Sequence, residues 1–158
     1  MATIPPVPRT NSLLGDLKKL LVSFQWDNWF QGLANRLNSS AEQVGSANLS
    51  AQSASVSATN LNAMTVTAGF YRVTYSQQVT RAATVSSSLT SVFSWTAGGV
   101  AQTSTNAAMT GNTTATHQEG MLPIQVDAST NVTYTLTYAS SGATSMQYAW
   151  RASIEALP

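Results

Sequence analysis

The sequence predicts a mainly β protein, in which a C-terminal antiparallel β-sandwich of the jelly-roll kind follows an N-terminal Pro-rich arm and an amphipathic helix or helix pair. The first observation is alternation: in residues 69–76, two tyrosines and a valine alternate with polar residues, which places the two sets on opposite faces of a strand. The pattern returns in 132–138 and 148–155 and is typical of an antiparallel sheet with one face in water. The second observation is that about seven or eight short strand patterns follow one another without intervening helices.

Charged residues are rare in this chain. They make up 8% of the 158 residues, and the net charge is +1, whereas ordinary soluble domains carry roughly 25% charged residues. The surface must therefore consist largely of neutral hydroxyl and amide groups. Nucleic-acid binding is disfavoured, because it needs clustered Lys and Arg to displace phosphate counterions. The absence of cysteine excludes disulfide bonds and thiolate chemistry.

Targeting signals are not evident in the sequence. A proline-rich stretch at residues 4–9 precedes any apolar run, so we expect no signal peptide. No run approaches the roughly 18 apolar residues that a membrane-spanning helix needs. We therefore expect synthesis in a cytoplasm and no membrane insertion.

Residues 1–38 are predicted to form an anchoring and oligomerisation segment. The first ten residues are proline-rich, which favours an extended arm. Two apolar stripes then predict one kinked helix or two short helices over 12–38, with Asp27 as a second N-cap. So large an apolar surface must pack on the β-domain, on copies of itself or on another protein. The predicted contact residues are Ile4, Val7, Leu13, Leu17, Leu20, Phe24, Trp26, Trp29, Phe30, Leu33 and Leu37.

A linker is predicted over residues 39–48, where the composition falls to small and amide residues, and the β-domain over 49–158. Its first strand is placed within 49–60. A long loop rich in Asn, Thr and Gly is expected at 106–116, and Pro123 indicates an edge position or a bulge for the strand that contains it. The other strands, each bounded by polar or glycine-containing turns, are predicted at 70–79, 89–95, 100–103, 118–126, 132–139 and 144–156.

Four stretches of the predicted β-domain carry a resemblance: Gly69–Tyr75, Ala82–Leu89, Trp95–Val100 and Tyr138–Tyr148. They resemble small jelly-roll domains of bacteriophage virion proteins. The Pro-rich arm followed by Trp-x-x-Trp-Phe at residues 26–30 is similar to the anchors of short phage fibres and decoration proteins. The resemblance implies a homotrimeric fibre, spike or decoration protein of the virion, assembled in the host bacterial cytoplasm. It also implies that residues 1–38 dock on another virion structural protein of the capsid, portal, neck or tail.

Catalytic and metal-binding patterns are not found in the sequence. His117 is the single histidine, and with Glu119 it supplies too few ligands for a zinc or facial-triad site, which needs about three or four. Neither a Gly-x-Ser-x-Gly elbow nor a Gly-rich phosphate loop occurs. We therefore expect a protein that is not an enzyme and has no cofactor.

A receptor-binding role stays open as the alternative, in which the chain is the module of a tail or head fibre that grips a host surface glycan. The loop 106–116 would supply hydrogen bonds, with Tyr138 or Trp150 nearby as an aromatic platform. A third alternative, a secreted module of the TNF or C1q kind, is disfavoured by the missing signal sequence. The surface-binding residues predicted in the loop are Asn106, Asn112, Thr113 and Thr114.

Overall fold

The computed structural model describes residues 28–34, 41–62 and 65–158. The chain divides between Ser40 and Ala41 into two compact units. The described residues of the first unit form a helix, and those of the second form nine β-strands.

The helix of the first unit covers residues 28–34 and lies within the helical region predicted after Asp27. Trp29 and Leu33 are partly buried, whereas Phe30 is 50% exposed. The rings of Trp29 and Phe30 meet edge to face, with their centroids 5.0 Å apart. The remaining residues predicted as anchoring contacts lie outside the described residues: Ile4, Val7, Leu13, Leu17, Leu20, Phe24, Trp26 and Leu37.

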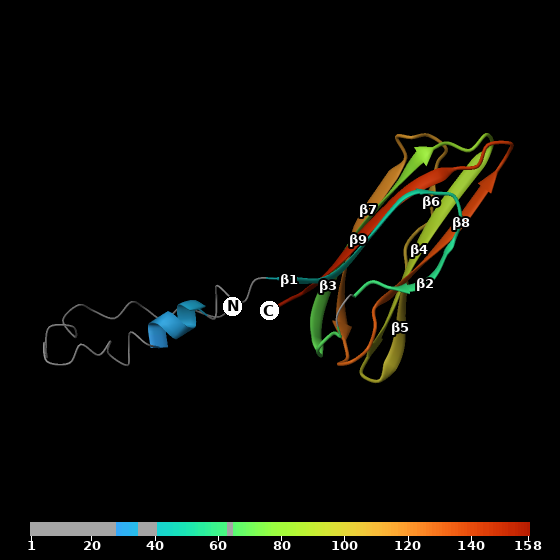
Figure 1. Cartoon of the computed structure of the whole chain (residues 1–158). Coiled ribbons are helices and arrows are strands. Elements are labelled where there is room, and N and C mark those ends of the chain that lie inside the picture. Colours follow the sequence, from blue (N-terminus) through green and yellow to red (C-terminus); the bar gives the residue numbers. More distant parts are fainter. Residues whose placement is uncertain (1–27, 35–40, 63–64) are drawn as a thin grey trace, which may run out of the picture. The chain divides into compact units, whose positions relative to one another are not determined.

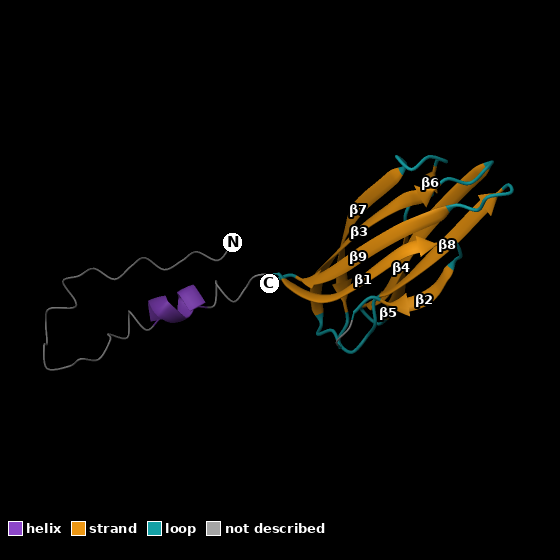
Figure 2. Cartoon of the chain, turned by 45° about the horizontal axis from the view of Figure 1, so that its top comes forward, coloured by secondary structure: helices purple, strands orange, loops and turns teal. Residues whose placement is uncertain are grey.

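Two antiparallel sheets face each other in the second unit (Figures 1 and 2). Sheet A has the order β1-β9-β3-β7, built from Glu42–Gln52, Gln147–Ala156, Gly69–Arg81 and His117–Val126. Sheet B has the order β2-β8-β4-β5, built from Val56–Asn60, Thr133–Ser141, Ser86–Ala97 and Val100–Thr105, and the short β6 (Met109–Thr110) also pairs with β4. Most successive strands change sheet, and this strand order is that of a jelly roll. The predicted mainly β fold with an antiparallel sandwich is confirmed. The Pro-rich arm predicted at residues 1–10 lies outside the described residues.

Aromatic rings from both sheets form the centre of the core. Trp150 of β9 is fully buried and stacks on Tyr134 of β8, with ring centroids 4.4 Å apart. The ring centroid of Phe93 on β4 lies 6.2 Å from that of Trp150 and 5.7 Å from that of Tyr75 on β3. These side chains lie on the faces that the alternation predicted as inward. The core is therefore an inter-sheet contact of large rings, each of which removes extensive apolar area from water.

Tyr148 shows how polar atoms are accommodated beside this core. Its ring is fully buried, and its hydroxyl donates a hydrogen bond to the carbonyl of Ala54 at 2.7 Å. Burial, together with the neighbouring Tyr134 and Tyr138, raises the pKa of Tyr148 to about 12. The phenol therefore stays protonated, and remains a donor, at neutral pH.

A buried hydrogen-bond chain also joins the two sheets. Trp150 Nε1 donates to Ser91 Oγ at 3.1 Å, and Ser91 Oγ donates to Gln77 Oε1 at 2.6 Å. Gln77 Nε2 donates to Gln118 Oε1 at 2.7 Å, and Gln118 Nε2 donates to the carbonyl of Ala107 at 3.2 Å. The polar groups of Trp150, Ser91 and Gln77 are buried, and each has a partner, which removes the penalty that an unpaired group would impose. The last bond, from Gln118 to Ala107, lies at the surface. The chain connects β9, β4, β3 and β7.

The predicted linker at 39–48 is wrong for most of its length, because β1 begins at Glu42. This strand pairs with β9 along its length, with Ala47 opposite Ala152. A strand needs no strong side-chain pattern where the backbone ladder of a neighbour supplies its hydrogen bonds. The small polar composition therefore belongs to an edge strand.

The remaining boundaries differ in smaller ways. The strand predicted within 49–60 is divided between the end of β1 and β2, with Ala51 at a positive φ of 53°. The predicted loop 106–116 contains β6, which the sequence analysis missed because two residues carry no periodicity. The other strands overlap their predicted ranges, and Pro123 lies in β7 at the edge of sheet A, as predicted.

Candidate interaction surfaces

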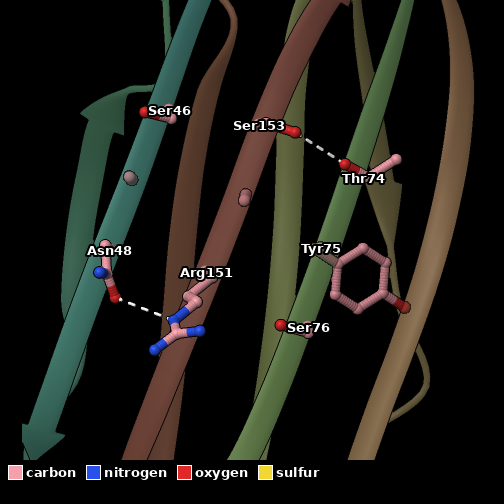
Figure 3. Close-up of a pocket in the computed structure, with 9 residues that line it drawn as sticks. Ser46, Asn48, Thr74, Tyr75, Ser76, Arg151 and Ser153 are labelled. Carbon is pink, nitrogen blue, oxygen red and sulfur yellow. Dashed lines mark hydrogen bonds between the residues drawn. The ribbon is translucent and has the colours of Figure 1, made fainter.

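The outer face of sheet A carries a shallow polar depression with a volume of about 580 Å³ (Figure 3). The register of β1, β9 and β3 sets its residues side by side in two rows. The depression forms because the side chains on these three neighbouring strands are mostly short and carry hydroxyl groups. The longer side chain of one arginine lies beside them. The first row is Ser46, Ser153 and Thr74, and the second is Asn48, Arg151 and Ser76.

Hydrogen bonds hold several of these side chains in place. Thr74 and Ser153 share a hydrogen bond of 2.8 Å between their hydroxyl oxygens. Arg151 Nε donates to Asn48 Oδ1 at 3.2 Å, and both pairs are drawn as dashed lines in Figure 3. The guanidinium is thus oriented by Asn48 while it remains exposed to solvent.

An ion pair borders the depression on the same face of sheet A. Arg72 and Glu155 lie opposite each other, two residues before Thr74 and two after Ser153. Arg72 Nε and Nη2 both donate to Glu155 Oε2. The Arg72 charge is therefore neutralised by its own neighbour, unlike that of Arg151.

A second depression of about 270 Å³ continues from the first, since both are lined by Ser76 and Arg151. Ser76 lies opposite Arg151 on one side and opposite Glu119 on the other. His117 lies at the start of β7 opposite Gln78. Both His117 and Glu119 are exposed. The two depressions together form a polar trough that crosses the strands of sheet A.

Tyr75 lines the trough from the core side. Its ring lies over Gly120, where a Cβ would come within 2.6 Å of the ring. Burial raises the pKa of the Tyr75 phenol. The tyrosine ring therefore occupies the space that a side chain at position 120 would need, and a larger residue there would have to displace it.

The outer face of sheet B differs in charge. Its strands, β2, β8, β4, β5 and β6, contain no Asp, Glu, Lys, Arg or His. Cross-strand rows such as Thr133, Ser94 and Thr103 present hydroxyl groups to this face. Every strand of sheet A, in contrast, contains at least one charged residue. We call the outer side of sheet B the uncharged face.

Asn112, one of the predicted surface-binding residues, is committed to internal contacts. Its Oδ1 accepts a hydrogen bond from the Ala83 backbone N–H at 2.7 Å, and its Nδ2 donates to the Ala83 carbonyl. Ser87 Oγ also donates to Asn112 Oδ1 at 3.3 Å. Asn112 therefore joins its loop to the connection between β3 and β4, at one end of the sandwich (Figure 1).

The other three loop residues are placed differently. Asn106 is partly buried, and its backbone N–H donates to the Ser91 carbonyl at 3.0 Å. Thr113 and Thr114 are exposed. The hydroxyl of Thr113 lies 3.2 Å from that of Thr116, and the carbonyl of Thr114 accepts a hydrogen bond from Gln78 Nε2 at 3.3 Å.

Of the two aromatic residues predicted as a platform, Trp150 is not accessible. Trp150 is 0% exposed, so the expectation that it could stack on a sugar is wrong. Alternation placed it on the packed face, and the second sheet covers that face. Tyr138 is half-buried, and its hydroxyl donates to the Met146 carbonyl at 2.9 Å.

Within residues 28–34, 41–62 and 65–158, no three His, Cys, Asp or Glu side chains gather closely enough to bind a metal ion. The described helix is too short to cross a membrane.

No protein-family profile matches the chain, and no curated protein sequence matches it. Because one fold can serve many functions, the fold alone does not assign a function, and the trough and the uncharged face are the features that bear on it.

The alternation in the sequence predicts the outward polar positions, including Arg151 and Ser153, but it does not predict the trough. Alternation is a property of single strands. The trough exists because β9 lies between β1 and β3, and no motif in the sequence indicates this neighbourhood.

Proposed function

We propose that this chain is a structural component of a bacteriophage virion, a homotrimeric short fibre, spike or decoration protein anchored by its N-terminal segment to another virion structural protein. The observation that carries the proposal is the uncharged face. Copies of one chain bring the same kinds of residue together repeatedly around a symmetry axis. A contact surface without charges avoids both like-charge repulsion and the cost of burying unpaired ions. The cores of protein interfaces are depleted in charge for the same reason.

The helix at 28–34 supports the anchoring part of the proposal. Phe30 is half exposed next to the ring of Trp29. An exposed phenylalanine in a segment with so many apolar residues is typical of a surface that another protein covers. The partner we propose is a capsid, portal, neck or tail protein of the particle.

Thr135→Arg is expected to dissociate the trimer. Thr135 lies on β8 opposite Val92, in the middle of the uncharged face. An arginine there would bury an unpaired charge in every subunit contact, at a cost of several kcal/mol each. Light scattering coupled to size exclusion should give about three times the chain mass of 16.7 kDa for the wild type, and one chain mass for the variant.

Gln125→Arg is the matched control, because Gln125 is exposed on the outer face of sheet A. This variant should remain a trimer. A wild-type chain that is monomeric at all concentrations would contradict the proposed function, and a trimeric Thr135→Arg variant would show that copies meet through another surface.

Deletion of residues 1–40 is expected to abolish incorporation into particles while the β-domain stays folded. The deletion ends before β1, which starts at Glu42 and pairs with β9, so the sheet keeps all its strands. Circular dichroism of the truncated chain should show an intact β-sheet spectrum. Mass spectrometry of purified particles should detect the full-length chain but not the truncated one. Particles that contain the truncated chain in equal amounts would refute the anchoring role.

A further inference from the structure

The trough on sheet A contains an arginine whose hydrogen-bonding capacity is only partly used. Arg151 Nε is bonded to Asn48, but the two terminal nitrogens have no hydrogen-bond partner among the described residues (Figure 3). Arg72, on the same face, is instead paired with Glu155. Arg151 is therefore an oriented guanidinium without a carboxylate partner. Its open edge matches the geometry of a carboxylate, which it can bind through two parallel hydrogen bonds.

The groups around Arg151 suit hydroxyl groups of a ligand. Ser46 and Ser76 are exposed and make no side-chain hydrogen bond within the described residues, and Asn48 Nδ2 is likewise unused. Beside them, the paired hydroxyls of Thr74 and Ser153 retain acceptor capacity. A volume of about 580 Å³ lies within the range of small-molecule sites.

We propose that this trough binds an acidic oligosaccharide, with the carboxylate of a sugar residue on Arg151 and sugar hydroxyls on the Ser and Thr side chains beside it. The site is distinct from the loop 106–116. Binding at the trough does not depend on trimer formation, because all of its residues belong to one chain.

The charge pattern selects among anionic ligands. Glu119 lies in the same row as Arg151, with Ser76 between them. A uniformly charged polyanion such as nucleic acid would meet this carboxylate and find no cluster of lysine and arginine. A simple anion offers only acceptors, so it would leave the acceptor capacity of the Thr74 and Ser153 hydroxyls unused. A ligand with one carboxylate and several hydroxyls uses both Arg151 and its polar neighbours, and Glu119 can accept hydrogen bonds from its hydroxyls.

The experiment titrates the full-length chain with two matched pairs of sugars, followed by NMR of the sugar signals. The acidic members are sialyllactose and the trimer of galacturonic acid, and the neutral members are lactose and a trimer of galactose. We expect at least one acidic sugar to bind with a dissociation constant of about 1 mM or tighter, as a shallow site allows, and its neutral match to bind at least about tenfold more weakly. Sulfate added to the sugar-bound protein at the concentration of the sugar should not displace the acidic sugar.

Arg151→Gln should weaken the binding by about tenfold or more, because the charge-assisted pair is lost. Arg81→Gln is the matched control: it removes the same charge from an exposed arginine of β3, whose Nε donates to the Ser145 carbonyl, and should leave the affinity unchanged. Ser76→Tyr, which fills the trough without changing charge, should also abolish binding. Circular dichroism of each variant checks the fold.

Each contrary outcome overturns the proposal. The proposal fails if neither acidic sugar binds, if a neutral sugar binds equally well, or if sulfate competes equally. Equal losses in Arg151→Gln and Arg81→Gln would show attraction by net charge alone. Because the oligomeric state is measured on the same samples, a failed trimer and a failed sugar site are told apart.

Discussion

Gly45→Ala is expected to lower the free energy of unfolding of the β-domain by about 3 kcal/mol. Extra atoms in a well-packed site typically cost about 1–3 kcal/mol, and this site is at the upper end. A Cβ at position 45 would lie 2.2 Å from the carbonyl oxygen of Leu61 and 2.6 Å from the Cα of Asn62. These are backbone atoms, which cannot rotate away as a side chain does. They are also held in place, because Leu61 N–H donates to the Val132 carbonyl and Val132 N–H donates to Asn62 Oδ1, each at 2.8 Å.

Gly69→Ala provides the matched control for this prediction. Gly69 begins β3. A Cβ added there would lie 3.9 Å from the nearest atom, a ring carbon of Tyr71, which is an ordinary contact distance. Alanine there should be neutral or slightly stabilising, because it reduces the freedom of the unfolded chain. Urea unfolding followed by tryptophan fluorescence measures both variants. Losses within about 1 kcal/mol of each other would contradict the role that we assign to the close approach at Gly45.

Ser91→Ala is expected to lower the free energy of unfolding by about 2–4 kcal/mol, because it leaves two buried groups without a partner, each at roughly 1–3 kcal/mol. Ser91 Oγ accepts from Trp150 Nε1 and donates to Gln77 Oε1. Both partners are fully or almost fully buried, so water cannot replace the lost hydroxyl. Urea titrations with circular dichroism and with fluorescence should give the same midpoint if unfolding is two-state.

Ser94→Ala is the control on the same strand. Ser94 faces the outer side of sheet B, and its hydroxyl lies 3.5 Å from that of Thr103. Loss of the Ser94 hydroxyl should change the free energy of unfolding by less than about 0.5 kcal/mol. In a Trp150→Phe background, Ser91→Ala should cost less than in the wild type, since the indole N–H is already gone. Equal costs in the two backgrounds would show that the Trp150–Ser91 bond contributes nothing.

The buried chain also bears on the proposed sugar site. Gln77 and Trp150 point into the core, and their neighbours along the strands, Ser76 and Arg151, point outward into the trough. Because successive strand residues alternate faces, fixing the inner pair fixes the backbone that carries the outer pair. The network therefore positions the backbone that carries the trough, and two of its members, Gln77 and Gln118, also line the second depression.

The sequence predicted the faces of the long strands well. Tyr71 and Val73 of β3 are buried, as are Ile124 and Val126 of β7, in agreement with their alternation. Ser91 was not predicted as a core residue, because its neighbours Leu89 and Phe93 carried the inward signal and a serine reads as polar.

The binding role of Asn106, Asn112, Thr113 and Thr114 stays a prediction. All four carry hydrogen-bonding groups, but Asn112 uses both of its amide atoms on the Ala83 backbone. Sequence cannot tell a polar side chain that binds a ligand from one that satisfies a neighbouring loop, since the two have the same chemistry.

By itself, the sequence determined the alternating faces of β3, β8 and β9 and the lack of charge in the strands of sheet B, because both are properties of single strands. Only the tertiary structure decided that β9 lies between β1 and β3, and hence that Asn48, Arg151 and Ser76 share one row. Pairing between strands is made by backbone hydrogen bonds that are alike for every residue, and its register depends on the whole packed face. The lack of charge in individual strands could therefore be read from the amino acids, whereas the uncharged face and the trough both required the sheets to be assembled.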